Sequence, residues 1–483
     1  MNQNTASKHF PTLSKVGRGI AFLFRRTYKY TLAVLIALAV VHGIATFILG
    51  RRVESRLKAI KAKGELVSPA EFGGPKVPDA ENAALIYAKA FKVIEPAKED
   101  TDFQGLDSFL DPEERAKDPE LWNKARRAVA RYGKAFPLVD EALSRPKCQF
   151  PVNWEAGWNA VFRHYAPLRS LARLLAADAM IQARDGRMDQ AVHSIDLALR
   201  MSKSAPNDPI VLAPLVQAAM VRVSTVALRD ILQHGNLTDA QATELYETLG
   251  SIDLGPAFVK AMQGERALGI WGFEYVRENP KSIIYLGSGE EAKRGGFGWR
   301  LLWWVWRPVL YADEGLCLDH MGKAVHAARL PFRDTKARRL ASDDPDFPRW
   351  AIMSSIFTLV FARARMKADD AMAEAAGSQI ALALRVYKNR YGAYPDTLDE
   401  LRAKLGWQIP KDIFSGKDFV YRPLGNGFVL YSIGGNLKDD RARPLTPTPA
   451  PQTNAAYWAQ ARGYDYTNAK GQKVADIVWE FDW

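Results

Sequence analysis

A strongly apolar run without formal charge lies near the N-terminus of the chain, at residues 31–49. As a helix, this run would measure about 28 Å, close to the roughly 30 Å hydrocarbon thickness of a bilayer. Tyr28 and Tyr30 precede the run and arginines bracket it, which is typical of membrane interfaces. Residues 43–45 (Gly-Ile-Ala) also fit a signal-peptide cleavage site, but the apolar run continues beyond them into a basic stop. We therefore predict an uncleaved transmembrane helix over residues 31–49, after a basic tail at residues 1–30.

The span contains one ionisable residue, His42. An ionisable group inside a membrane is a functional candidate by default, but a neutral imidazole in the outer third of the bilayer costs little. We therefore assign His42 no role. Ala39-x-x-x-Gly43 would support pairing of two such helices, which is a weak signal in an Ala-rich span.

Residues 50–79 start as a basic helix-like stretch and then become rich in proline and glycine, which predicts a juxtamembrane linker. Helical spacing of apolar residues follows over most of residues 80–345 and predicts an α-helical domain. Its clearest unit is a helical hairpin at residues 171–183 and 188–202, whose small residues resemble a tetratricopeptide hairpin. One hairpin is not a repeat array, so we expect an irregular all-α domain. Further helices are predicted at residues 209–234, 238–249 (capped by Thr238) and 256–279.

Residues 295–311 form a Trp-rich segment. Trp299, Trp303 and Trp306 fall at helical spacing, with Trp304 beside them. One hypothesis is an amphipathic helix lying on the membrane surface. Because apolar residues cover nearly the whole circumference, we favour a helix buried against its neighbours.

A second boundary follows at residues 343–348, where prolines and aspartates interrupt the helical pattern. We assign residues 346–483 to a C-terminal module that begins with a long helix at about residues 350–390. Tyr-Gly-Ala-Tyr-Pro at residues 391–395 predicts the exit from this helix, and Asp396 is expected to cap a short helix after it.

The rest of the module alternates like strands. Residues 419–422 and 428–433 flank Gly-Asn-Gly at residues 425–427, which predicts an antiparallel hairpin. Near the end of the sequence, Ile477, Trp479, Phe481 and Trp483 alternate with Val478, Glu480 and Asp482. This alternation predicts a strand that adds to the same small sheet.

The net charge of +12 belongs almost entirely to the flanks of the predicted span. Residues 1–63 carry twelve Lys or Arg and one acid, which leaves 54 basic and 53 acidic residues in the other 420. Basic residues beside a span meet anionic headgroups, so the bilayer is the expected partner of this charge. Since the rest of the chain has no basic excess, we expect no nucleic-acid partner.

The usual catalytic motifs are absent: there is no G-x-S-x-G, phosphate-binding loop, dinucleotide fingerprint or H-E-x-x-H. This favours an interaction module over an enzyme. A ligand pocket is the alternative, with His164 near Trp154 and Trp158, and with Glu265 beside Arg266. A core histidine and a structural ion pair are the simpler interpretations of these residues.

Two cysteines, Cys148 and Cys317, lie in apolar contexts without metal-site spacing. Buried free thiols are favoured over a single disulfide, which export would permit.

Three motifs of the module follow one another in a familiar order. They are Ala-Leu-Ala-Leu-Arg-Val-Tyr-Lys-Asn-Arg-Tyr-Gly-Ala-Tyr-Pro from Ala381, Pro-Lys-Asp-x-Phe-Ser-Gly-Lys from Pro410, and Phe-Val-Leu-Tyr-Ser-Ile-Gly-Gly-Asn-x-Lys-Asp-Asp from Phe428. In this order they resemble the globular part of type II secretion major pseudopilins. The resemblance covers about residues 379–440 and 476–479, and it implies a long helix, a connecting segment and a small antiparallel sheet. The helix of a pseudopilin begins at its own processed membrane segment, whereas the long helix of this module is internal to the chain. We therefore expect that this chain is not a processed pilin subunit.

In major pseudopilins the loop after the last hairpin binds calcium. The resemblance places Asp439, Asp440 and Asp476 at comparable positions, and carboxylates are the hard oxygen ligands that calcium takes. An insertion at residues 441–473, Pro-rich at residues 444–451, separates them. Solvated loop aspartates are therefore the simpler interpretation, and no other cofactor is expected.

The whole chain also resembles a group of large, uncharacterised bacterial membrane-anchored proteins. They share Val-Pro-Asp-Ala-Glu-Asn-Ala-Ala (here residues 77–84), a helical middle and this module. The resemblance implies a bacterial inner membrane but no activity. Six basic residues and no acid before the span favour a cytoplasmic N-terminus, although the segment after the span is also basic.

These observations predict a mainly α protein with a transmembrane helix, an irregular helical domain and a small α+β module. We expect the bulk outside the cytoplasm, bound to other envelope proteins of secretion or cell-surface machinery. An envelope hydrolase or ligand-binding protein is the alternative.

Overall fold

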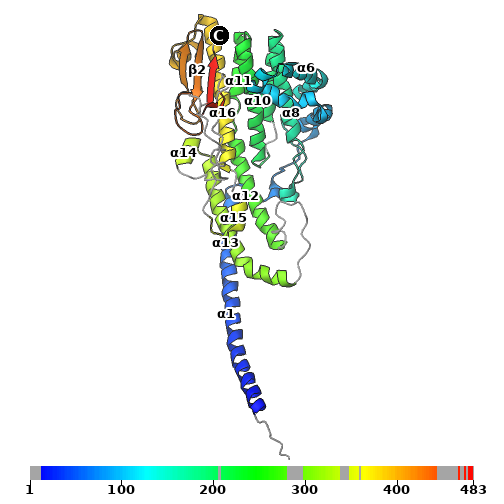
Figure 1. The fold of residues 1–483 in the computed structure, drawn as a ribbon, viewed down its shortest axis with the longest axis vertical. Coiled ribbons are helices and arrows are strands. Elements are labelled where there is room, and N and C mark those ends of the chain that lie inside the picture. Colours follow the sequence, from blue (N-terminus) through cyan, green and yellow to red (C-terminus); the bar gives the residue numbers. More distant parts are fainter. Residues whose placement is uncertain are drawn as a thin grey trace, which may run out of the picture.

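The structure is a computed structural model that describes residues 12–204, 208–279, 297–337, 347–357, 361–442, 466–467, 473–474 and 477–481. Within these residues the chain is mainly helical, with a small three-stranded sheet near the C-terminus, as predicted. Figure 1 shows one long helix that projects from an elongated helical body, with the sheet at the opposite end of the body.

The projecting helix is α1 (Thr12–Ala62). Its part Tyr28–Ala62 is long and apolar enough to cross a membrane, and its most apolar stretch has no residue buried inside the protein. Exposed Leu, Val and Ile side chains over residues 32–48 agree with a helix that faces lipid. The predicted helix at residues 31–49 lies within α1, which is longer than the predicted span at both ends.

The same helix continues beyond the apolar stretch, where a linker was predicted. Val53 is buried with Ile270 and Leu318. Arg56 forms an ion pair of 2.8 Å with Asp319. Residues 50–62 are therefore a rigid extension of α1, packed against the helices that follow in the body.

A set of short helices comes next, at the right of the body in Figure 1. They are η1 (Pro69–Glu71), η2 (Asp79–Glu81), α2 (Ala84–Ile94), η3 (Glu95–Glu99), α3 (Thr101–Gln104), α4 (Leu106–Leu110), α5 (Pro112–Lys117), α6 (Glu120–Tyr132), η4 (Gly133–Ala135), α7 (Phe136–Leu143) and η5 (Trp154–Asn159).

Long helices form the centre of the body. They are α8 (Tyr165–Arg184), α9 (Met188–Ser204), α10 (Leu212–His234), α11 (Asp239–Gly250) and α12 (Gly255–Glu278). The predicted hairpin is the α8–α9 pair, which turns at Gly186 with a positive φ of 75° that glycine adopts without strain. Thr238 caps α11 in a reciprocal box with Gln241, so this predicted cap is confirmed.

The remaining helices precede the sheet along the chain, and among them α16 contacts it. They are α13 (Phe297–Ala328), α14 (Phe332–Ala337), α15 (Ile352–Phe357), α16 (Phe361–Tyr391) and α17 (Leu398–Leu405). Thr397 caps α17 by accepting a hydrogen bond from the Glu400 amide, so the predicted cap at Asp396 is wrong by one residue. Asp396 instead donates its backbone N–H to the Glu400 carboxylate.

The sheet has the order β1–β2–β5, and both pairs of strands are antiparallel. Its strands are β1 (Val420–Leu424), β2 (Gly427–Ser432) and β5 (Ile477–Phe481). The predicted hairpin and the predicted final strand are both confirmed, with Leu430 opposite Trp479. Two short strands, β3 (Tyr466–Thr467) and β4 (Lys473–Val474), pair within the predicted insertion. The Pro-rich part of that insertion, residues 444–451, lies outside the described residues.

One hydrophobic core runs through the body and the sheet, from Phe72 to Trp479. It passes the domain boundary predicted at residue 346, because α16 packs along α10 and α11 on one side and contacts β2 and β5 on the other. Gly377 of α16 lies directly against the Trp479 indole, where a Cβ would come within 2.2 Å of the ring. The C-terminal module therefore shares its core with the helical body.

We expect Gly377→Ala to destabilise the protein by about 1–3 kcal/mol, the usual cost of overpacking a core. Gly322 of α13 is the matched control, because a Cβ there meets nothing within 4 Å. Gly322→Ala should be neutral or stabilise the helix by about 0.5–1 kcal/mol. The midpoints of thermal unfolding of the full chain in detergent measure both effects. If the two variants unfolded at the same midpoint, the close contact between α16 and β5 would be contradicted.

Candidate functional site

His164, the first candidate from the sequence, is buried next to the start of α8. Its Nε2 lies 3.2 Å from Oδ2 of Asp208, and the hydroxyl of Tyr165 donates to the same oxygen at 2.6 Å. The ring of Phe150 stacks on the imidazole, with centroids 4.4 Å apart. His164 is therefore a packed and hydrogen-bonded core residue, the simpler of the two interpretations.

The two tryptophans that were expected to share a pocket with His164 pack elsewhere. Trp154 lies edge-on to Phe72, and Trp158 lies edge-on to Trp271. The ring contacts of His164 are instead with Phe150, Phe162 and Tyr165.

Glu265 and Arg266 do not pair with each other, so that prediction is wrong. Glu265 accepts a hydrogen bond of 2.7 Å from the backbone N–H of Val211. Arg266 forms an ion pair of 2.9 Å with Glu65, which also pairs with Arg329 at 2.6 Å. Successive residues of α12 thus point to different neighbours, as helical geometry requires. Arg266 fastens the segment after α1 to the body, a contact between residues 201 positions apart in the sequence.

Parts of Glu265 remain accessible, but its carboxyl group is surrounded by protein. Burial raises the pKa of this carboxyl to about 7, opposed only by the hydrogen bond from Val211. A carboxyl that titrates near neutral pH is a usual feature of catalytic acids. Here it has no catalytic neighbour among its recorded contacts, because His164 and Arg266 are both engaged elsewhere.

Two buried carboxylates that the sequence did not single out lie side by side on α13. Asp313 accepts the backbone N–H groups of Met353 (2.9 Å) and Ser354 (3.2 Å) at the start of α15. Glu314 is fully buried and pairs with Arg277 of α12. Burial raises the pKa of both carboxyls. They hold α12, α13 and α15 together, which is a structural role.

The Trp-rich segment forms the first turns of α13. Its side chains from residue 301 onward are largely exposed, so the predicted burial of this segment is wrong. The exposed fractions are 53% for Leu301, 50% for Leu302, 43% for Trp304, 50% for Val305 and 39% for Trp306. Trp303 is partly buried and donates its indole N–H to the carbonyl of Arg277 at 3.1 Å. The side chain of Trp299 lies outside the described residues.

Pro308 stands inside α13, just after these turns. Proline lacks the N–H that would bond to the carbonyl four residues earlier, which here belongs to Trp304. Nε2 of His42 donates to this carbonyl oxygen at 2.7 Å, and the two rings lie 4.0 Å apart. His42 thus replaces the helix donor that Pro308 removes. In Figure 1 the first turns of α13 lie crosswise to α1, at the base of the body.

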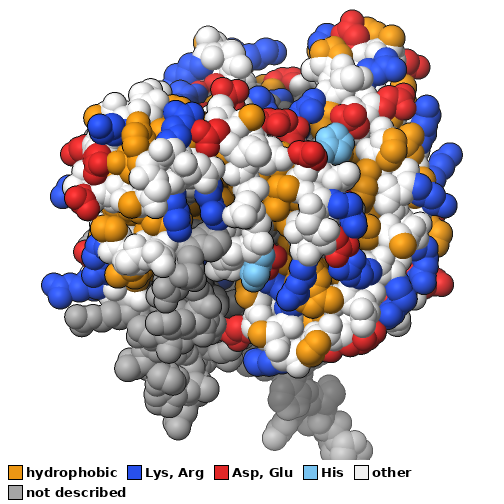
Figure 2. Space-filling model, turned by 90° about the horizontal axis from the view of Figure 1, so that it is seen from above, with side chains coloured by type: hydrophobic (Ala, Val, Ile, Leu, Met, Phe, Trp, Pro, Cys, Tyr) orange, Lys and Arg blue, Asp and Glu red, His pale blue; other side chains and the backbone are white. Residues whose placement is uncertain are grey.

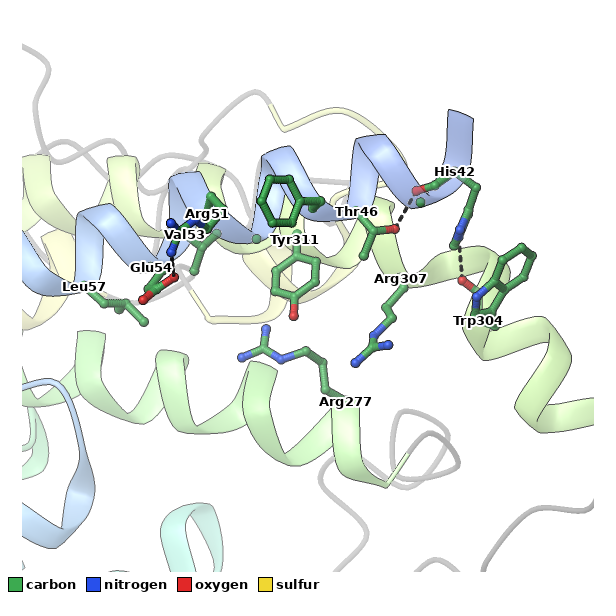
Figure 3. A pocket seen from close by; sticks show the side chains of 13 residues that line it. His42, Thr46, Arg51, Val53, Glu54, Leu57, Arg277, Trp304, Arg307 and Tyr311 are labelled. Atoms are coloured by element: carbon green, nitrogen blue, oxygen red, sulfur yellow. Dashed lines mark hydrogen bonds and ion pairs between the residues drawn. The ribbon is translucent and has the colours of Figure 1, made fainter. Parts of the chain in front are cut away.

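An open cavity of about 600 Å³ lies where α1 passes α12 and α13 (Figure 3). Three arginines line it, Arg51 of α1, Arg277 of α12 and Arg307 of α13, against one carboxylate, Glu54. Figure 3 shows the guanidinium groups of Arg277 and Arg307 near the hydroxyl end of Tyr311. The cavity is basic although its arginines come from three distant parts of the chain.

A second hollow lies between α11, α16 and the loop after α17. Two adjoining cavities of about 440 and 410 Å³ share Gly250, Gln379 and Pro410. The rings of Tyr246 and Trp407 lie 4.5 Å apart at its edge. We call this the junction groove, because it lies where the helical body meets the C-terminal module.

The aspartates of the expected calcium site have protein partners. Oδ1 of Asp439 accepts from the hydroxyl of Tyr431 (3.0 Å), and Oδ2 of Asp440 accepts from the amide of Asn436 (2.7 Å). Asp476 lies outside the described residues. In the described part of the chain, no three His, Cys, Asp or Glu side chains cluster as metal ligands would. Calcium at this loop stays a prediction.

Cys148 and Cys317 are free thiols, as favoured from the sequence. Burial raises the pKa of Cys148 to about 12 and that of Cys317 still further.

Comparison of the chain with models of protein families, with curated proteins and with solved structures finds no match. The resemblance to major pseudopilins therefore stays a prediction.

The His42 hydrogen bond can be tested by a double-mutant cycle in the full chain. His42→Phe keeps the ring but removes the donor, and leaving the Trp304 carbonyl unsatisfied should cost about 1–3 kcal/mol. In a Pro308→Ala background, the restored amide of residue 308 satisfies that carbonyl, and the cost should nearly vanish. The midpoints of unfolding in detergent measure the stability of the four proteins in the cycle. If His42→Phe lowers the stability equally in both backgrounds, His42 does not act by satisfying the Trp304 carbonyl.

Proposed function

We propose that this chain is a single-pass protein of the bacterial inner membrane that binds other envelope proteins as a scaffold. In this proposal, residues 31–49 span the bilayer, the N-terminal tail is cytoplasmic and the body lies outside the cytoplasm. The excess of basic residues before the span supports this orientation.

The observation that carries the proposal is the rigid joint between the anchor and the body. The helix α1 continues without a break to Ala62 and packs on α13. Ion pairs from Arg56 to Asp319 and from Glu65 to Arg266 fasten the joint on either side. A rigid joint fixes the orientation of the body relative to the membrane, which a scaffold needs in order to present a binding surface.

The junction groove is the surface that we assign to a protein partner. Aromatic side chains such as Tyr246 and Trp407 are enriched at the centres of protein interfaces. Figure 2, viewed from the end opposite α1, shows basic and acidic side chains interspersed over that face. This mixed charge gives no support to a nucleic-acid partner at that end of the body.

The alternative function, an envelope hydrolase or ligand-binding protein with a pocket around His164, has less support. His164 is bound to Asp208, Glu265 to Val211 and Arg266 to Glu65. Each of these three side chains is therefore engaged by a neighbouring group of the protein.

We expect Trp407→Ala to abolish capture of the partner. The full tagged chain and the variant would each be cross-linked in native membranes, purified in detergent, and compared by quantitative mass spectrometry. Leu424→Ala is the control, because Leu424 is an exposed apolar residue outside the groove. Loss of an interface hot spot costs about 2 kcal/mol, which lowers the amount of captured partner about tenfold or more. A protein that is enriched with the wild type and with the control, but depleted to this extent with Trp407→Ala, would support the junction groove as the binding surface.

Unfolding midpoints of both variants show that they remain folded. If no protein is enriched over a membrane protein of unrelated sequence, the proposed scaffold function fails.

A further inference from the structure

The exposed turns at the start of α13 lie beside the apolar stretch of α1. Leu301, Leu302, Trp304, Val305 and Trp306 are all exposed. A contiguous apolar strip of this kind is unusual on a surface that faces water, and it marks contact with a protein or a membrane. Because the strip adjoins the exposed face of α1, it continues the surface that the bilayer covers.

The contact with His42 sets the depth of this strip. His42 precedes the end of the span by seven residues, which corresponds to about 10 Å along a helix. Helices that lie in the membrane interface bury their apolar face about 5–10 Å into the boundary between headgroups and acyl chains. Tryptophan and leucine are the side chains typical of that position. The strip therefore lies at the depth of an interfacial helix.

The cavity above the strip has the opposite chemistry. Arg307 makes no ion pair with any residue that the structure describes, and it is exposed at the mouth of the cavity. Arg277 pairs with the buried Glu314, whereas Glu54 is shared between Arg51 (3.2 Å) and Lys58 (2.9 Å). The cavity therefore keeps a positive charge at the level where lipid phosphates lie.

We propose that residues 301–306 are embedded in the leaflet next to the body, and that this cavity binds the phosphate of an anionic phospholipid. This inference rests on the transmembrane assignment in the proposed function, but not on a protein partner. Arginine binds phosphate oxygens with paired N–H donors, which favours an anionic ligand such as a phosphate over an uncharged one. The hydroxyl of Tyr311 adds a neutral donor at the same place (Figure 3). Nδ1 of His42 is enclosed by the protein, so the donors that face the cavity are those of the arginines and Tyr311.

The depth of the strip can be measured in the full chain reconstituted in lipid nanodiscs. A spin label at Leu302→Cys reports its own accessibility to oxygen, which concentrates in lipid, and to a water-soluble nickel complex. Leu212→Cys on α10 is the control, because Leu212 is also exposed (42%) but lies on a helix of the body rather than beside the apolar stretch of α1 (Figure 1). Burial protects the two native thiols, Cys148 and Cys317, from the spin-label reagent. Treatment of the wild-type chain with the same reagent shows whether they stay unlabelled.

We expect oxygen to relax the label at residue 302 more than the nickel complex does, and the reverse at residue 212. Access of the nickel complex to both labels would overturn the membrane contact. Low access of both reagents to residue 302 would also overturn it, because the strip would then be covered by protein.

Lipid selectivity tests the cavity itself. Spin-labelled phosphatidylglycerol and phosphatidylcholine would be compared for their motionally restricted fraction around the full chain in nanodiscs. The wild type should favour phosphatidylglycerol, and Arg307→Gln should lower this preference about fivefold, the contribution of one arginine at an anionic surface. Arg169→Gln, at an exposed position of α8, is the matched control and should change nothing. Arg277 is left intact, since its removal would strand the buried Glu314.

Two results would count against the lipid. An equal preference in the wild type and in Arg307→Gln would show that the arginine does not select the headgroup. Loss of the preference in millimolar inorganic phosphate, at constant ionic strength, would identify a site for free phosphate instead. Neither result depends on whether a protein partner is captured, so a failure here is distinct from a failure of the scaffold function.

Discussion

The hydrogen bond from His42 to the carbonyl of Trp304 joins two elements that are otherwise 262 residues apart in the sequence. Pro308 leaves that carbonyl without its helix donor, and a carbonyl in an apolar environment needs a partner. Once α1 supplies the donor, the first turns of α13 are held against it. The exposed apolar strip and the basic cavity both follow from this placement, because each is built from α1 and α13 together.

Above this contact the same two helices form the base of the body. Val53 and Leu318 pack between α1, α12 and α13, and Arg56 reaches Asp319. The buried carboxylates of Asp313 and Glu314 then connect α13 to α15 and α12. Motion of the anchor is therefore transmitted to the body through packed side chains and paired charges. A body on a flexible linker would lack this coupling.

Local signals in the sequence predicted the elements well. The apolar run at residues 31–49, the cap at Thr238 and the Gly-Asn-Gly turn each depend on neighbours a few residues away. Contacts between distant residues could not be predicted in this way. Glu265 and Arg266 are adjacent in sequence yet point to different partners, because successive helix positions are about 100° apart. The boundary at residue 346 was drawn from local composition, whereas Gly377 and Trp479 show that the core continues across it.

The Trp-rich segment shows why an apolar circumference alone does not predict burial. Apolar residues all around a helix need a cover, but lipid serves as well as protein, and the sequence pattern does not distinguish the two; the structure adds that the segment is exposed and lies beside α1. The net charge of a segment likewise does not predict where charged side chains gather in the fold. The chain after residue 63 is nearly neutral in total, yet folding brings Arg277 and Arg307 to the basic flank of the anchor beside Arg51. The fold therefore places basic side chains from three distant parts of the chain around one cavity, which the sequence flanks alone do not predict.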